Sequence, residues 1–227
     1  MEQRKVNFGH NNRTLVLIFS FMYFANSVFA QDSKIEIPPF DDKYSKYVGQ
    51  LESGNLNIDY ADFRNSYLDS KQFGKKRKSN YDSLKTLTYA EIKNKNYPEV
   101  INLTKAMLSI DYTSMFAHKY LQQTYKIFGD TLHQKRYHEI EFGLLNSIVN
   151  SGDGKTCESG WHVIQIEEEY FILNMIGAQF QSQSISSSPK NICDKMVVKT
   201  EDGEATYYFE ANKVFEMEKK LFEGKHL

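Results

Sequence analysis

Apolar residues between Asp41 and Ser151 recur at spacings of three and four, the period of a helix that buries one face. The segments with this pattern are 81–93, 98–111, 117–128 and 131–150. Gly129 and Gly152 follow the last two segments, and glycine commonly ends a helix. Because the intervening turns are short, the pattern predicts helices that pack as antiparallel neighbours.

The helical turns at Asn96-Tyr97 and Asp130-Thr131 lie 34 residues apart, which is the period of tetratricopeptide units. Leu121 and Tyr125 also occupy positions where that repeat has a large apolar and an aromatic residue. Other positions depart from the repeat: Val100 and Gln134 replace small residues, and Gln122 replaces a glycine. A tetratricopeptide-like array of at most two hairpins and a generic helical bundle are therefore both open.

After Gly152 the period changes to two, as expected for strands. The run from Trp161 to Ile166 alternates, and Glu167–Glu169 then begins a short helix that ends at Gly177. Asp202-Gly203 is typical of a two-residue hairpin turn. Counting outward from it pairs Val198 with Tyr207 and Met196 with Phe209, which gives the hairpin one apolar face.

The whole pattern predicts an α+β fold: N-terminal antiparallel helices in tetratricopeptide-like hairpins, then a small antiparallel sheet with one or two short helices. A helix over 215–222 is expected to cover the apolar face of the hairpin. The predicted parts are a signal peptide over 1–30, a helical part over 31–152 and an α+β part over 153–227. We expect 31–227 to form one composite domain.

The first 30 residues have the organisation of a secretory signal. Arg4, Lys5 and Arg13 precede an apolar run that is about half the length of a membrane-spanning helix, and small residues at Val28 and Ala30 suit cleavage. The sequence therefore predicts export to the periplasm or beyond, with no membrane span after cleavage. Since Gln31 and not cysteine follows the cleavage point, no lipid anchor is expected and the product is predicted to be soluble.

Removal of the signal segment, whose net charge is +2, changes the formal charge from -1 to -3. A nucleic-acid ligand is not expected, because proteins that neutralise phosphates are usually strongly basic. Both cysteines, Cys157 and Cys193, remain after cleavage. An oxidising compartment permits a disulfide between them, but two unpaired thiols are an equal alternative.

The sequence does not have the residues that common catalytic and cofactor motifs require at fixed spacings. Gly154-Lys155-Thr156 lacks the earlier glycine of a phosphate loop, and Phe142 stands where a zinc-protease helix has its second histidine after His138. No cofactor or metal is predicted. Four residues remain as candidates for a pocket between the two halves: His138, Asp153, His162 and Glu168. Of these, only His162 and Glu168 form a local acid-base cluster, and a surface histidine beside a solvated helix start is the simpler interpretation.

Several blocks of the chain resemble exported bacterial proteins of the family catalogued as domain of unknown function 4919. The blocks are Ile58-Asp59-Tyr60, Phe63-Arg64, Ala117-His118, Gly143-Leu144-Leu145, Ser151-Gly152-Asp153-Gly154-Lys155, Glu168-Glu169-Tyr170 and Tyr208-Phe209. The resemblance covers about 47–221, and it implies export and a single composite domain. It assigns no activity, cofactor or catalytic residue. The cysteine pair and the basic run after Phe73 are not part of the pattern.

These observations favour an exported, non-enzymatic interaction or scaffold module of the bacterial envelope, with a protein as its partner. Tetratricopeptide-like hairpins bind ligands on a concave face, so exposed tyrosine, asparagine and lysine side chains are expected there. The alternative is a hydrolase or lyase with a site between the helical and sheet parts. That alternative predicts that at least three of the four candidate residues meet in one pocket.

Overall fold

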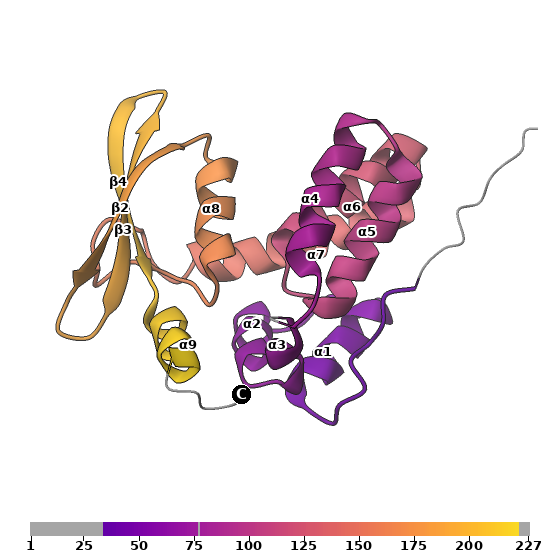
Figure 1. The fold of residues 1–227 in the computed structure, drawn as a ribbon, viewed down its shortest axis with the longest axis horizontal. Coiled ribbons are helices and arrows are strands. Elements are labelled where there is room, and N and C mark those ends of the chain that lie inside the picture. The colour runs from indigo at the N-terminus through magenta and orange to yellow at the C-terminus, as the bar shows by residue number, and fades with distance from the viewer. Residues whose placement is uncertain (1–33, 77, 223–227) are drawn as a thin grey trace, which may run out of the picture. The chain divides into compact units, whose positions relative to one another are not determined.

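The computed structural model describes residues 34–76 and 78–222, so the predicted signal peptide lies outside the described part (Figure 1). The helical half contains α1 (Lys43–Glu52), α2 (Tyr60–Leu68), α3 (Lys71–Lys76), α4 (Tyr81–Lys93), α5 (Tyr97–Ile110), α6 (Met115–Phe128) and α7 (Thr131–Val149). It is followed by β1 (Trp161–His162), α8 (Ile166–Met175), β2 (Gln179–Ser187), β3 (Ile192–Thr200), β4 (Gly203–Glu210) and α9 (Asn212–Phe222). The fold is α+β, as the sequence predicts.

Helices α4 to α7 form two consecutive hairpins, in which α4 packs on α5 and α6 on α7, while α5 and α6 join the hairpins. The chain turns sharply between α6 and α7 because Gly129 adopts a left-handed conformation with φ of 73°. Asp130 then caps α7 by accepting a hydrogen bond from the backbone N–H of His133. Local sequence thus sets the hairpin ends within one or two residues of their predicted positions.

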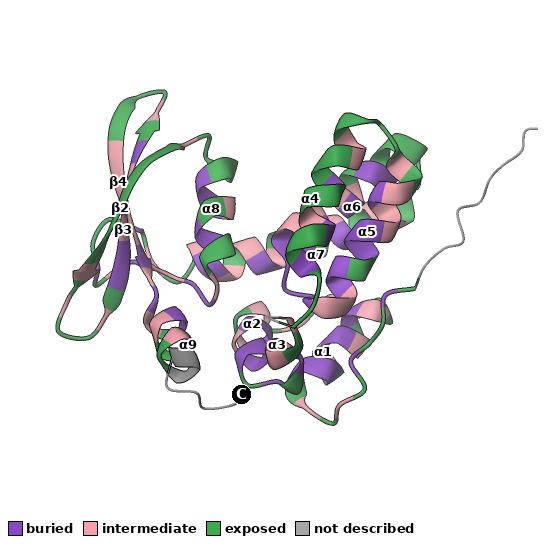
Figure 2. Cartoon of the chain, in the orientation of Figure 1, coloured by how far each residue is buried: buried purple, intermediate pink, exposed green. Residues whose placement is uncertain are grey.

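The sheet has the strand order β1-β4-β3-β2. Strands β2, β3 and β4 are antiparallel, but β1 runs parallel to β4, so the sheet is mixed rather than wholly antiparallel. The predicted strand over 161–166 is limited to its first two residues. Strand β2 was not predicted, because its side chains are exposed along nearly the whole strand and show no buried alternation (Figure 2).

The predicted register of the β3–β4 hairpin is wrong by two residues. Met196 pairs with Tyr207 and Val198 with Ala205, since the turn lies at Glu201-Asp202 and Gly203 already begins β4. Side chains alternate with a period of two, so this shift leaves every residue on its predicted face. Met196, Val198 and Phe209 are accordingly buried.

One hydrophobic core runs through both halves of the described chain. It includes Phe63 and Leu144 of the helices as well as Val198 and Phe209 of the sheet. Helix α8 contacts both α6 and β2, and α9 contacts β3. Within the described residues, no helix is both long enough and apolar enough to cross a bilayer.

Candidate functional site

Helix α8 begins with three consecutive glutamates, and each of them faces a different element. Glu167 forms an ion pair with Lys76 of α3 at 3.2 Å. Glu168 pairs with Arg64 of α2. Glu169 lies against Asp194 of β3, whose charge acts on it. The first turn of α8 is therefore a junction and not a solvated helix start.

The Arg64–Glu168 pair is the most buried charged contact of this junction, with exposed side-chain fractions of 1% and 4%. The contact is bidentate: Nε and Nη2 of Arg64 donate to the two carboxylate oxygens at 2.9 and 2.6 Å. Arg64 also donates to the hydroxyl of Ser147 and to the carbonyl of His162, while Glu168 accepts the backbone N–H of Ile164. Both charges are thus fully matched by hydrogen bonds, which is the condition for a tolerable buried pair.

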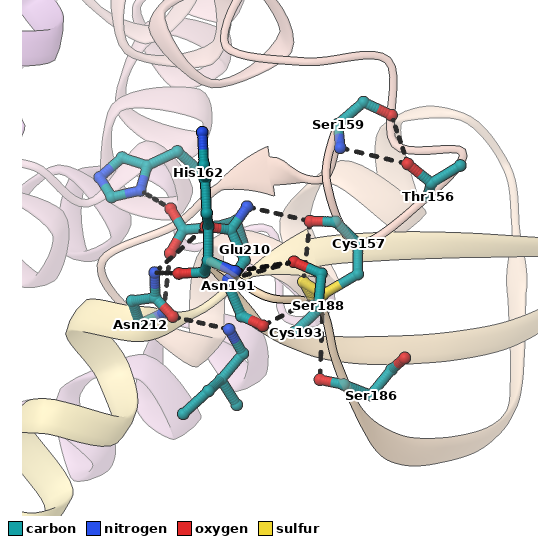
Figure 3. The surroundings of a disulfide bond; sticks show 12 residues. Thr156, Cys157, Ser159, His162, Ser186, Ser188, Asn191, Cys193, Glu210 and Asn212 are labelled. Carbon is teal, nitrogen blue, oxygen red and sulfur yellow. Dashed lines mark hydrogen bonds and ion pairs between the residues drawn. A yellow bond between two sulfur atoms is a disulfide. The ribbon is translucent and has the colours of Figure 1, made fainter.

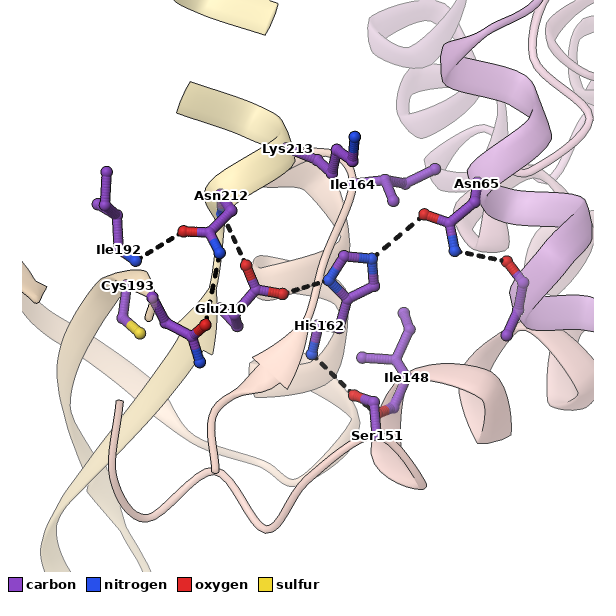
Figure 4. A network of polar contacts seen from close by, with 12 residues as sticks. Asn65, Ile148, Ser151, His162, Ile164, Ile192, Cys193, Glu210, Asn212 and Lys213 are labelled. Atoms are coloured by element: carbon purple, nitrogen blue, oxygen red, sulfur yellow. Dashed lines mark hydrogen bonds and ion pairs between the residues drawn. The ribbon is translucent and has the colours of Figure 1, made fainter. Parts of the chain in front are cut away.

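The imidazole of His162 lies between Glu210 and Asn65 (Figure 4). Its Nδ1 bonds the carboxylate of Glu210, and its Nε2 lies 3.3 Å from the side-chain oxygen of Asn65. Burial opposes ionisation of Glu210, but hydrogen bonds from His162 and from the backbone N–H of Asn212 hold its pKa below the ordinary value. Both ring nitrogens therefore have partners, and the ring joins β1, β4 and α2.

The same network continues to a disulfide between Cys157 and Cys193, whose Cα atoms are 5.7 Å apart (Figure 3). Asn212 accepts the backbone N–H of Ile192, and the side chain of Asn191 donates to the carbonyl of Cys157. The disulfide and the Asn191 bond fasten the loop before β1 to the start of strand β3, and the Asn212 bond joins α9 to the same strand.

Asp153 has a local role in that loop. Its carboxylate accepts hydrogen bonds from the hydroxyl of Ser159 and the backbone N–H of Lys155, and these bonds hold its pKa below the ordinary value. The neighbouring Gly152 is required sterically, because a Cβ there would lie 2.2 Å from the carbonyl oxygen of Ser159. The Ser-Gly-Asp-Gly block is thus explained by loop closure.

Of the four predicted pocket residues, His162 and Glu168 both contact Arg64, but His162 does so through its backbone carbonyl while its imidazole bonds Glu210. His138 lies on α7 and packs on the ring of Phe142, and Asp153 stays in its loop. One cavity in the described part of the chain is lined by Glu168, and none of the other three candidates lines it.

This cavity is a cleft of about 400 Å³ bounded by α4, α6 and α8. We name it the aromatic cleft after the rings that line it: Tyr81, Tyr89, Phe116, Tyr120, Tyr170 and Phe171. Phe116 and Tyr120 are one helical turn apart on α6, and the ring of Tyr89 lies 5.0 and 6.0 Å from theirs. Helices α4 and α6 are the first helices of the two hairpins, so the cleft lies on the side of the hairpins that these first helices form.

Two sets of charged residues line the aromatic cleft. In the first, the ammonium of Lys76 lies 3.0 Å from Asp111 and 2.5 Å from the side-chain oxygen of Gln165. Burial alone would lower the pKa of Lys76, but Asp111 and Glu167 outweigh burial and raise it. In the second, Lys85 and Lys119 lie 5.4 and 5.5 Å above the rings of Phe116 and Phe171.

The sequence alone did not identify the aromatic cleft or Arg64 as parts of a site. Arg64 stands in an ordinary amphipathic segment, and its partner Glu168 is 104 residues away. The apolar pattern places Tyr120 on the buried stripe of its helix with Ala117 and Leu121, but in the structure Tyr120 is only half-buried and lines the cleft. Phe116 lies outside that stripe, and a large ring in such a position is the one local signal of the cleft.

In the described residues, no group of three or more His, Cys, Asp or Glu side chains is arranged to hold a metal ion. The geometry defines an α+β protein in which helices α4, α6 and α8 border an aromatic cleft. The family described as Domain of unknown function (DUF4919) matches residues 42–220, and the chain belongs to this family. No curated protein and no solved structure gives a significant match.

Proposed function

We propose that the protein is an exported, non-enzymatic binding module that holds an extended segment of a protein partner in the aromatic cleft. The observation that carries this proposal is the open cavity of about 400 Å³ on the α4 and α6 side of the hairpins. Its volume lies in the range of ligand sites, and its mixed aromatic and polar lining is typical of them. Tyr89 and Tyr170 are both exposed at this cleft.

The environment of α8 supports a recognition role. Helix α8 is held at its first turn by the buried Arg64–Glu168 pair, so the cleft wall is fixed before any ligand arrives. A preformed site loses less conformational entropy on binding than one that must first order itself. The signal-like N-terminus and the disulfide support an exported location, because structural disulfides persist in oxidising compartments.

The alternative of a hydrolase or lyase has less support. It requires at least three of the residues His138, Asp153, His162 and Glu168 to meet at one pocket, and only Glu168 lines the aromatic cleft. The interaction proposal does not depend on them.

Site-specific photocrosslinking in intact cells tests the proposal. A photoreactive phenylalanine analogue replaces Tyr89 in the cleft, and a control variant carries it at Leu132, which is 77% exposed on α7. We expect a discrete covalent adduct from position 89 and none of that mass from position 132. The purified partner should bind the wild type, and a Tyr89→Ala, Tyr120→Ala variant should bind it at least tenfold more weakly. Identical adducts from both positions, or none from position 89, would refute the proposal.

A further inference from the structure

The charged residues that line the aromatic cleft differ in whether their charge is matched. Lys76 is paired with Asp111 and Glu167, and Glu168 is paired with Arg64. These acidic and basic groups therefore already form ion pairs within the protein. A charged ligand must be bound by other residues of the cleft.

Lys85 of α4 and Lys119 of α6 carry the unmatched charge. Among the described residues, neither ammonium lies within ion-pair distance of a carboxylate. Lys119 donates to the neutral side chain of Asn174 at 3.3 Å. The charges of Lys119 and Glu141 interact, but burial raises the pKa of Glu141 to about 7 and the two groups form no ion pair.

Both ammonium groups lie over aromatic rings, which attract cations without neutralising them. An anion that enters the cleft can contact the two lysines while its neighbouring apolar groups lie on Tyr89, Phe116 and Tyr120. A single small anion would use the lysines and leave these rings uncovered. A carboxylate attached to a chain with apolar side chains would use both features.

Resting on the function proposed above, we infer that the aromatic cleft recognises an acidic, aromatic-containing segment of the partner, with Lys85 and Lys119 as the residues that bind its carboxylates. Charge complementarity argues for this partner, since the cleft holds two unmatched positive charges beside exposed rings. The contribution of the lysines falls with ionic strength, because both groups are accessible to solvent and are screened by salt.

The test uses two synthetic peptides that alternate phenylalanine with either glutamate or glutamine. Binding to the purified mature protein is measured by calorimetry at low and high salt. We expect the glutamate peptide to bind about tenfold more tightly than the glutamine peptide at low salt, and the preference to shrink at high salt. The variant Lys85→Ala, Lys119→Ala should bind both peptides equally. The matched control Lys93→Ala, Lys126→Ala changes exposed lysines of the same helices outside the cleft and should keep the preference.

The possible outcomes separate this inference from the function on which it rests. Equal binding of both peptides to the wild type would overturn the acidic specificity and leave the binding module intact. Tighter binding of inorganic phosphate than of the glutamate peptide would replace the acidic segment by a small anion. Failure of both peptides, with an adduct still formed from position 89 in cells, would also overturn the inference and leave the proposed function standing.

Discussion

Two charged regions lie beside α8, and they differ in how their charges are satisfied. Around Arg64 and Glu168 the charges are almost wholly buried and every one has hydrogen-bond partners. In the aromatic cleft, Lys85 and Lys119 keep their charge beside open space and aromatic rings.

The difference distinguishes residues that build the fold from residues that are free to bind. A buried charge without its partner is strongly destabilising, so a matched buried pair cannot be released for a ligand. A partly exposed lysine stays solvated when no ligand is bound. The following predictions test this contrast, beginning with the largest expected effect.

Loss of Arg64 should have the largest effect on stability. Arg64→Ala leaves Glu168 buried without its partner, and we expect a loss of about 3–5 kcal/mol in the free energy of unfolding. Urea denaturation followed by circular dichroism measures the change. Substitution of both members, Arg64→Met with Glu168→Leu, should recover much of the loss because no charge is then left unpaired.

Removal of an exposed pair serves as the control for this prediction. Lys43 and Asp62 form an ion pair whose side chains are 62% and 36% exposed. Lys43→Ala should change stability by less than about 1 kcal/mol. Equal effects of the two alanine variants would show that the buried pair has no special role.

The disulfide should have the next largest effect. It joins residues 36 positions apart. A disulfide that closes such a loop restricts the unfolded chain and thereby stabilises the folded state by about 2–4 kcal/mol. Replacement of Cys157 and Cys193 by serine should lower the free energy of unfolding by this amount. Wild type denatured in the presence of reductant should match the variant, and a reductant-insensitive wild type would contradict the prediction.

Glu169 should make stability depend on pH. Burial, followed by the charge of Asp194, raises the pKa of Glu169 from 4.5 to about 9. Neither carboxylate oxygen accepts a hydrogen bond from any described residue, whereas the protonated form can donate one to Asp194. The folded state therefore keeps a proton that the unfolded chain loses above pH 4.5, and stability falls as pH rises from 4.5 toward 9.

Glu169→Gln removes this titration and keeps a donor for Asp194. We expect the variant to match the wild type near pH 5 and to exceed its stability by roughly 1–3 kcal/mol at pH 8. Denaturation curves across this pH range measure the difference. Glu204→Gln, at an exposed position of β4, should leave the slope unchanged, and equal slopes in wild type and Glu169→Gln would contradict the assignment.

The cleft lysines should have the smallest effect on stability. Lys85→Ala with Lys119→Ala removes no buried ion pair, so the free energy of unfolding should change by less than about 1 kcal/mol. A thermal melt of the double variant measures this. A loss comparable to that of Arg64→Ala would assign these lysines to the fold and weaken the contrast between the two regions.

The helices were predictable because their signals are local. The period of the apolar stripe, the glycine after α6 and the cap at Asp130 all act within a few residues. The face of each β3 and β4 residue was predictable for the same reason. The register was not, because a shift of two residues preserves every face and only the geometry of the turn at Glu201-Asp202 distinguishes the alternatives.

The candidate site was predictable only in part. His162 and Glu168 were selected because they are close in sequence, yet each takes its main side-chain partner from a distant segment, Glu210 and Arg64 respectively. Strand β2 lacks buried alternation, and β1 is held by parallel pairing with β4. Periodicity reveals burial, and it does not report pairing between distant segments.

The sequence by itself determined the α+β order of the elements, the ends of the helical hairpins and the apolar faces of the β-hairpin, because these depend on local periodicity and turn chemistry. Only the tertiary structure decided which charges are matched. Arg64 meets Glu168 across 104 residues, whereas Lys85 and Lys119 lie over aromatic rings and form no ion pair with any described carboxylate. Charge pairing depends on distance in space, so it follows from the packing of α8 against the helices and not from the order of residues along the chain.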